Sequence, residues 1–324
     1  MTTVPQVSNL LVKLSQKLFL DDLQRDQFIQ SLVSPSPFSP AILWLNDRPD
    51  PYPFQRENPL SWQPQWVDRL AISEKPGKHF LHEQGYFYCL DFSSVFASSV
   101  LQAIAPFPQI ILDMCASPGG KGIFAWRLFK PDLLLANEVI GKRRGALISN
   151  LKRCRIEGAI AISVDSKIVA QEIPESADLV IVDAPCTGQS LLAKGEKNPG
   201  CFHPVTIKKN ANRQRRILAN SASTVAPKGY LAYMTCAYSI EENEQVCEWF
   251  LSQFPEFSPV PIPLLSTYQS RHSRLPCYRM FPQDHLGAGA FTILFQNQKG
   301  GDRLPLSQEF LTHPSNVAIK LNSG

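Results

Sequence analysis

The sequence predicts an α/β protein with a mostly parallel central sheet flanked by helices. Between residues 86 and 299, five short apolar runs alternate with helical stretches, and this alternation is typical of parallel strands joined by crossover helices. A glycine-rich turn follows the first run, and four of the five runs end at an acidic residue. The runs predicted to be strands are 109–113, 133–138, 159–165, 179–183 and 230–235.

Three regions are expected along the chain. Residues 1–85 form a small N-terminal accessory region, residues 86–299 the α/β domain, and residues 300–324 a polar C-terminal tail without a strong pattern. The accessory region begins with an amphipathic helical stretch from Leu10 to Leu32, and prolines from Pro35 to Pro64 then interrupt regular structure. Its aromatic side chains either stack on RNA bases or pack a small core. These residues are Trp44, Tyr52, Phe54, Trp62 and Trp66.

Composition indicates an ordinary globular protein. The chain has 324 residues, 44% of them hydrophobic, and a net charge of +4 that permits a polyanionic partner without requiring one. No apolar run reaches the roughly 18 residues of a membrane helix, and the start lacks the features of a signal peptide. We therefore expect a cytoplasmic protein, a monomer by default, without a membrane partner. The eight cysteines lack paired CxxC spacing, so neither a bound metal nor a disulfide framework is expected.

A nucleoside pocket is predicted where the first three strands end. The turn from Cys115 to Lys121 has paired glycines that allow close backbone approach, and the helix after it presents free N–H groups to an anion. Glu138 lies where doubly wound proteins place an acid on ribose hydroxyls, and Asp165 is placed to accept from an adenine amine. Each acid taken singly is equally well explained as a solvated strand end. Similar turns also serve nicotinamide and flavin cofactors, although the GxGxxG order is missing here.

Two cysteines each follow an apolar strand at the same predicted edge of the sheet. Cys186 ends the segment Asp183–Cys186, and Cys236 follows Thr235. A buried cysteine is usually an inert small hydrophobe. Because open parallel sheets gather ligands at the carboxyl ends of their strands, two thiols and an acid in one crevice favour chemistry over packing.

Three ordered motifs carry a family resemblance. They are the Cys115–Lys121 turn, the Asp183–Cys186 segment, and Thr235-Cys236 followed by Ser239, Glu241, Glu242 and Asn243. Together they resemble the Sun/Nop-type family of RNA cytosine-5 methyltransferases, over about residues 86–296. This chain has Ser117 where the family more often has Ala and Gly122 where it more often has Thr, and its closing segment 279–291 departs from the usual Gly-Phe-Phe ending.

The resemblance implies a Rossmann-like methyltransferase that transfers a methyl group from S-adenosylmethionine to carbon 5 of a cytidine in structured RNA. Carbon 5 is too electron-poor to attack a sulfonium methyl, so a nucleophile must first add at carbon 6, and a thiolate suits this task. Family similarity assigns the addition to Cys236 and assistance in releasing the adduct to Cys186. The residues expected at the cofactor are Cys115, Ala116, Ser117, Pro118, Gly119, Gly120, Lys121, Glu138, Arg143, Asp165 and Asp183.

Two further residues are expected to act on the base. Asp183 is the acid placed to protonate ring nitrogen 3, provided that desolvation raises its pKa. Lys121, at the end of the glycine turn, either steers the base by its charge or is a solvated helix residue. The predicted catalytic set is therefore Cys236, Cys186, Asp183 and Lys121.

Basic residues are clustered enough to hold RNA phosphates. One cluster comprises Lys142, Arg143, Arg144, Lys152, Arg153 and Arg155, and the other comprises Lys208, Lys209, Arg213, Arg215 and Arg216. A charged run on a helix is often only a solvated face. The second cluster lies between the two cysteine motifs and is the better RNA candidate. The target base must be unstacked or flipped before the thiols can reach it.

Other functions stay open at this point. A DNA cytosine-5 methyltransferase would attack with Cys186, in its Pro-Cys motif, and would leave Cys236 without a purpose. A non-catalytic RNA-binding protein that retains the methyltransferase fold would have lost a reacting residue, and all of them are present. A nicotinamide oxidoreductase lacks support from the glycine pattern. Ribosomal RNA is favoured over transfer RNA by the family alone, since no feature of the sequence identifies the RNA.

Overall fold

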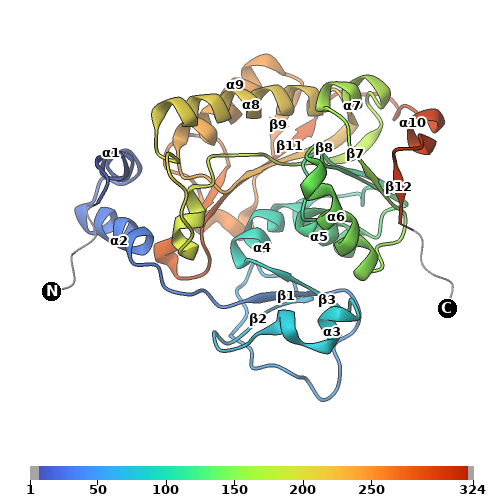
Figure 1. Ribbon diagram of the computed structural model, residues 1–324. Helices are drawn as coiled ribbons and strands as arrows, with labels where there is room; N and C mark the ends of the chain where they lie inside the picture. The colour runs from blue at the N-terminus through green and yellow to red at the C-terminus, as the bar shows by residue number, and fades with distance from the viewer. Residues whose placement is uncertain (1–6, 320–324) are drawn as a thin grey trace.

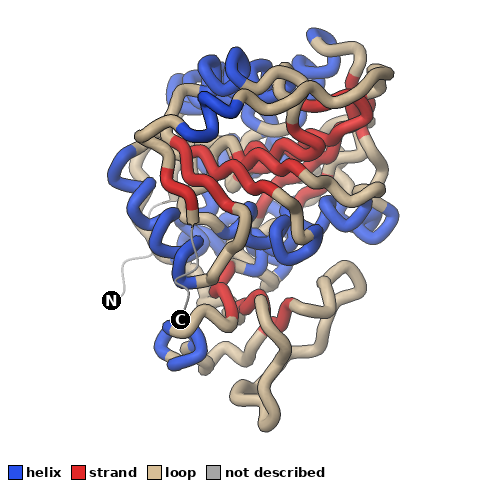
Figure 2. Tube along the Cα trace, turned by 90° about the vertical axis from the view of Figure 1, so that its right-hand side faces the viewer, coloured by secondary structure: helices blue, strands red, loops and turns tan. Residues whose placement is uncertain are grey.

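The computed structural model describes residues 7–319 and has a nine-stranded sheet at its centre (Figures 1 and 2). Its strand order is β10-β11-β8-β7-β4-β5-β6-β12, with β9 paired to β11. Strands β8, β7, β4, β5 and β6 run parallel, and the others pair antiparallel. The bounds are β4 Ile110–Asp113, β5 Leu133–Asn137, β6 Ala159–Ile162, β7 Ala177–Asp183, β8 Val225–Thr235, β9 Phe257–Pro259, β10 Tyr278–Met280, β11 Ala290–Asn297 and β12 Val317–Ala318.

The five predicted strands form the parallel part of this sheet, which confirms the predicted fold class. The third strand is shorter than expected, since it ends at Ile162 rather than at Asp165. Asp165 instead caps the following helix, because its side chain accepts a hydrogen bond from the Lys167 backbone N–H (2.9 Å).

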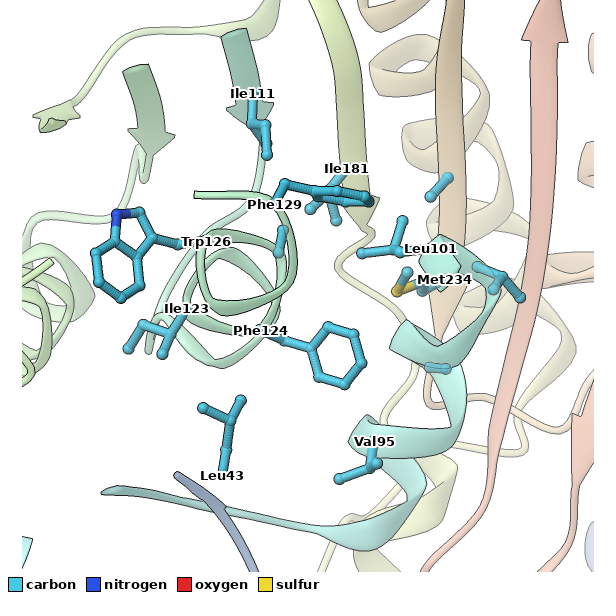
Figure 3. Close-up of a cluster of buried hydrophobic side chains, with 14 of the residues drawn as sticks. Leu43, Val95, Leu101, Ile111, Ile123, Phe124, Trp126, Phe129, Ile181 and Met234 are labelled. Carbon is cyan, nitrogen blue, oxygen red and sulfur yellow. The ribbon is translucent and has the colours of Figure 1, made fainter. Parts of the chain in front are cut away.

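Helices cover both faces of the sheet. Neighbouring residues of a strand point to opposite faces, so Ile111 and Leu112 of β4 belong to two separate core clusters. Figure 3 shows Ile111 and Ile181 of the sheet on one side of α5 and Leu43 of the small sheet described below on its other side. One face carries α4 Phe92–Ser98, α5 Gly120–Phe129 and α6 Gly141–Arg153, and the other carries α7 Ser166–Glu172, α8 Pro204–Ala222 and α9 Glu244–Gln253.

A small antiparallel sheet forms a further layer beyond α5 (Figure 2). Its strands follow the order β2-β1-β3, and β3 lies past the expected boundary at residue 85. Trp44 and Trp62 are only 1% and 2% exposed, so they pack the core of this region rather than offering a ring face to RNA. The bounds are β1 Ala41–Trp44, β2 Val67–Arg69, α3 Phe80–Glu83 and β3 Phe87–Leu90.

The helical stretch predicted between Leu10 and Leu32 is helical but is divided into two helices. They are α1 Asn9–Leu18 and α2 Asp22–Val33. Asp21 interrupts the pattern by capping α2, accepting a hydrogen bond from the Gln24 N–H (2.8 Å). Phe28 of α2 packs edge-on against Tyr238, with ring centroids 5.0 Å apart, so this helical hairpin lies against the loop that follows β8.

Residues 300–319, expected to be part of a polar tail, are structured. They contain α10 Gln308–Thr312 and β12, which pairs antiparallel with the edge strand β6. Before α10, Arg303 forms an ion pair with Asp178 of β7, with Nη1 and Oδ2 2.6 Å apart. A two-residue strand is too short to produce a readable alternation, and the rest of the predicted tail, 320–324, lies outside the described residues. Between residues 7 and 319, no helix is long and apolar enough to cross a bilayer.

Candidate active site

The predicted site residues gather at one edge of the large sheet. Strands β8, β7, β4 and β5 are parallel neighbours, so the loops after them open at the same edge. The chain leaves β4 toward β5 on one side, whereas β7 and β8 lie on the other side of β4. The crevice between these two halves is the usual ligand site of a doubly wound sheet. We call this the catalytic edge.

The two predicted cysteines meet at the catalytic edge. Their Sγ atoms are 3.0 Å apart, although the residues are separated by 50 positions in the chain. The hydrogen bond between them lowers the pKa of Cys236 and raises that of Cys186, and burial raises the pKa of Cys186 further. The geometry allows either sulfur to donate, and the raised pKa of Cys186 with the lowered pKa of Cys236 favours Cys186 as the donor and Cys236 as the thiolate.

Lys121 lies between Asp183 and the small helix α4. Its Nζ is 3.0 Å from Asp183 Oδ2 and donates to Ser94 Oγ at 3.0 Å. Burial disfavours the ammonium, but the Asp183 carboxylate outweighs it and raises the pKa of Lys121. Lys121 is therefore a largely shielded cation, with a side chain 14% exposed, paired with the predicted acid and not a solvated helix residue.

Asp113, at the end of β4, is a site residue that the sequence did not predict. Its carboxyl group is fully buried, and among the described residues neither oxygen has a partner in hydrogen-bond geometry. Burial, and next the negative charge of Asp183, raise the pKa of Asp113 to about 7. A Cβ on Gly122 would stand 3.0 Å from Asp113 Oδ2, so the glycine at this position leaves the carboxyl group without a side-chain neighbour there.

The glycine turn is shaped for close backbone approach. Gly119 has φ +116°, which favours glycine, and a Cβ on Gly120 would lie 2.6 Å from Leu90 Cδ2. Arg143 braces the turn by donating from Nη2 to the Ser117 carbonyl (2.6 Å), and the Ser117 hydroxyl donates to the Arg143 carbonyl (2.9 Å). Arg143 therefore positions the turn.

Glu138 directly follows β5 and is 3% exposed. Its Oε1 accepts a hydrogen bond from the Ile140 N–H (2.9 Å), whereas Oε2 is buried and has no hydrogen-bond partner among the described residues. Arg143 Nη1 lies 3.4 Å from Oε2 outside hydrogen-bond geometry. One acceptor is thus left for a ligand.

The remaining predicted cofactor residues divide into two kinds. Asp165 is a half-exposed helix cap whose Oδ2 lies 3.9 Å from Arg216 Nη2, so its role at an adenine stays a prediction. Burial strongly raises the pKa of Cys115, so its thiol is inert packing within the turn.

Between residues 7 and 319, no group of three or more His, Cys, Asp or Glu is arranged to hold a metal ion.

Two buried carboxylates after β8, Glu242 in a short 3-10 helix and Glu244 at the start of α9, were not predicted as site residues. Glu242 accepts hydrogen bonds from Thr187 and Ser239, which lie in the two cysteine loops. Glu244 forms an ion pair with Arg279, and Arg279 also donates to the Tyr238 carbonyl (2.8 Å). Both glutamates lie in or beside the motif after Cys236, but only the fold reveals that they are fully buried.

The two basic clusters differ in what their side chains do. On α6, Arg153 donates to the His82 carbonyl (2.7 Å) and Arg144 to the Ser315 carbonyl, so these arginines connect parts of the fold. On α8, four of the five basic side chains are exposed and Arg215 is half-buried. We call this set the α8 basic face; it comprises Lys208, Lys209, Arg213, Arg215 and Arg216.

The fold and the residues at the catalytic edge define a protein of the Rossmann-like methyltransferase class. A family model described as 16S rRNA methyltransferase RsmB/F matches residues 102–296. The chain belongs to this family, which confirms the resemblance seen in the three motifs.

Individual relatives agree with this assignment. Ribosomal RNA small subunit methyltransferase F of Klebsiella pneumoniae (strain 342) is 29% identical over 262 residues, which are 79% of this chain and 54% of the relative. The protein in the crystal structure of PH0851 has 26% sequence identity to this chain and a TM-score of 0.72, and the match covers 90% of this chain and 69% of that one. The crystal structure of NSun6 from Pyrococcus horikoshii with SFG has 16% sequence identity and a TM-score of 0.71, and the match covers 90% of this chain and 99% of that one. At this identity the match supports the fold and nothing more. The chain spans about half the length of the curated relatives it matches.

Proposed function

We propose that this protein is an S-adenosylmethionine-dependent RNA cytosine-5 methyltransferase that acts on ribosomal RNA. The observation that carries the proposal is the pair of thiols with Sγ atoms 3.0 Å apart, beside the Lys121–Asp183 ion pair, at the catalytic edge. Membership of a family described by 16S rRNA methylation supports ribosomal RNA over transfer RNA. The cytoplasmic location and the monomeric state stay predictions.

The residues around the glycine turn fit S-adenosylmethionine. The unpartnered Glu138 Oε2 offers an acceptor for ribose hydroxyls, and the first turn of α5 offers backbone N–H groups to a carboxylate. Asp165 would accept from the adenine amine with the oxygen that does not cap α7. Bound there, S-adenosylmethionine would supply an electrophilic methyl group.

Cys236 and the Lys121–Asp183 pair would perform the first step. The Cys236 thiolate adds to carbon 6 of cytosine, which makes carbon 5 nucleophilic. Ring nitrogen 3 must gain a proton as the C–S bond forms. Because Asp183 Oδ2 lies 3.0 Å from Lys121 Nζ, the ammonium can pass this proton through Asp183 to the ring.

Release reverses the addition after carbon 5 has been methylated. The proton on carbon 5 passes to solvent water, the bond between Cys236 and carbon 6 breaks with its electron pair left on sulfur, and the proton on nitrogen 3 returns to the Lys121–Asp183 pair. The Cys186 thiol would donate a hydrogen bond to the departing sulfur and stabilise it as a thiolate. With Cys186 in this role, the DNA-type alternative, in which Cys186 would attack, is disfavoured.

The α8 basic face would hold the RNA. The helix α8 is the crossover between β7 and β8, so its N-terminal part follows the chain that leaves the catalytic edge after Cys186, and phosphates bound there would lie toward that edge. Lys208, Lys209, Arg213 and Arg216 are exposed and available for such contacts. The flipped cytosine would enter the crevice between Cys236 and the glycine turn.

The different places of the two thiols in this cycle provide the test. Cys236→Ala cannot add to the base, so it should form no covalent RNA complex and lose activity by several orders of magnitude. Cys186→Ala should still add and accept the methyl group, but should accumulate protein joined to RNA as a slowly migrating band on a denaturing gel. The double variant should show no band.

A matched control is Cys154→Ala, which removes a buried thiol at the end of α6. It should turn over normally and accumulate no adduct. A band with Cys236→Ala and none with Cys186→Ala would reverse the assigned roles and favour the DNA-type mechanism. A second probe is RNA that carries 5-fluorocytosine, which should trap the wild-type protein through Cys236.

A further inference from the structure

The two thiols at the catalytic edge are chemically identical, yet only one can attack the base. Each lies beyond the carboxyl end of one of two neighbouring parallel strands, Cys236 directly after β8 and Cys186 three residues after β7. Their Sγ atoms are close enough to share one proton. The groups around each sulfur therefore decide which of them keeps it.

Glu242, in the short 3-10 helix Ile240–Glu242, is fully buried beside the Cys186 loop. Its carboxylate accepts hydrogen bonds from Thr187 N (2.8 Å), Thr187 Oγ1 (2.6 Å), Ser239 Oγ (2.7 Å) and Gln214 Nε2 (3.0 Å). All of these donors are neutral, and among residues 7–319 Glu242 forms no salt bridge. The negative charge is therefore solvated by the protein but not cancelled by a cation.

These contacts fix the carboxylate against the loop that carries Cys186. Thr187, which binds it with both its amide and its hydroxyl, is the residue directly after Cys186. The Gln214 side-chain amide donates both to Glu242 and to the Pro185 carbonyl (3.1 Å), on the other side of Cys186. The same carboxylate thus holds the chain just before and just after this thiol.

We propose that Glu242 is a positioning residue that keeps the proton on Cys186 and so reserves the thiolate for Cys236. This inference rests on the proposed function, because it explains which thiol attacks there. A negative charge beside Cys186 disfavours a second negative charge on its sulfur. Cys186 consequently remains a thiol that donates to Cys236. Ser239, which follows Cys236, ties the second loop to the same carboxylate and helps to maintain the 3.0 Å separation of the sulfurs.

The groups around Cys186 agree with this assignment. The hydrogen bond to Cys236 and burial raise the pKa of Cys186 well above its ordinary value, and Glu242 adds to the effect. Tyr233, which also lies nearby, is buried with a strongly raised pKa and donates its hydroxyl to the Glu242 carbonyl (2.7 Å). It stays neutral and offers no positive charge to Cys186.

The groups around Cys236 have the opposite effect. The hydrogen bond from Cys186 lowers the pKa of Cys236 against the effects of burial and Asp183, and Ser190 and the Lys121 ammonium lower it further. Tyr238 is buried nearby and remains neutral, because burial strongly raises its pKa. At Cys236 the cation Lys121 thus opposes the anion Asp183, whereas the charge that acts on Cys186 is that of Glu242.

The test measures the ionisation of each thiol in the full-length, reduced protein without RNA. Initial rates of alkylation by iodoacetamide are followed from pH 5 to pH 10 and assigned to each cysteine by peptide mass spectrometry. In the wild type, the alkylation midpoint of Cys236 should lie below that of Cys186. Glu242→Gln keeps the shape and most hydrogen bonds but removes the charge, and it should lower the Cys186 midpoint by about one pH unit or more.

Two further variants separate charge from packing. Glu242→Asp retains the charge and should leave the Cys186 midpoint near the wild-type value. Glu241→Gln removes a charge one residue away, from a half-exposed side chain that binds Lys17 (2.8 Å), and should leave both midpoints unchanged.

Several outcomes would overturn the inference. The first is an alkylation midpoint of Cys186 that is the same in Glu242→Gln as in the wild type. The second is a midpoint of Cys186 that shifts in Glu242→Asp by as much as it shifts in Glu242→Gln. A wild-type protein in which Cys186 ionises before Cys236 would also overturn it, and this measurement does not depend on whether a variant folds. Failure of the proposed function would appear differently, as a wild type that transfers no methyl group to RNA whatever the order of the midpoints.

Discussion

The buried carboxyl group of Asp113 should make the stability of this protein depend on pH in a defined window. Its pKa is raised from an ordinary 3.8 to about 7, so near neutral pH the folded protein retains a proton that the unfolded chain releases. This contribution to stability is complete below about pH 4 and is lost as the pH rises toward 7. The full difference corresponds to roughly 4 kcal/mol, since each pH unit is worth about 1.4 kcal/mol.

Asp113→Asn has nearly the same shape and cannot ionise, so it should not lose this contribution. Between pH 5 and pH 8.5, the wild type should lose about 2–3 kcal/mol of unfolding free energy relative to Asp113→Asn. Urea unfolding at the two pH values, followed by tryptophan fluorescence under reducing conditions, measures this difference. Asp132→Asn, at an exposed position, is the matched control and should show no pH-dependent gain. An equal stability difference between Asp113→Asn and wild type at both pH values would refute the reasoning.

Three further predictions concern the cofactor, RNA and the fold. Glu138→Ala and Asp165→Ala should each weaken S-adenosylmethionine binding by on the order of 1–3 kcal/mol in calorimetry, and wild-type affinity in both would contradict the pocket. Replacing the α8 basic face by glutamine should weaken RNA binding and reduce its salt dependence by about one unit of slope per lost phosphate contact; an unchanged slope would mean a solvated face. Arg279→Met leaves Glu244 buried without its cation and should cost about 3–5 kcal/mol in urea unfolding, whereas exposed Arg271→Met should cost little. Equal losses in these two variants would contradict a stabilising role for the pair.

The parallel sheet was predictable because its strands are apolar on both faces. Each run between Ile110 and Thr235 contributes to two core clusters, so it appears in the sequence as a short continuous apolar stretch. The meeting of Cys186 and Cys236 was predictable for a related reason, since parallel strands end at one edge. The periodicity of the apolar runs and the topology of a parallel sheet were therefore enough to predict that the two cysteines lie in the same crevice.

Features that depend on burial or on single contacts were not predictable. The carboxyl groups of Asp113 and Glu242 look like ordinary strand-end and loop acids in the sequence, and only the packing around them removes them from water. The break between α1 and α2 involves single contacts, namely the Asp21 cap and the bonds of Arg25 to the Phe19 and Leu20 carbonyls. Arg153 looked like a phosphate ligand, but its closeness to the carbonyls of His82 in α3 and Phe87 in β3 could not be known.

The C-terminal segment has a consequence for how the chain folds during its synthesis. Strand β6 is an edge of the parallel sheet until residues 317–318 pair with it, and about 155 residues of sequence separate the two strands. A nascent chain that has already formed β4, β5 and β6 would thus expose unpaired backbone N–H and C=O groups to other nascent chains. Until residue 318 has left the exit tunnel, β6 remains such an unpaired edge.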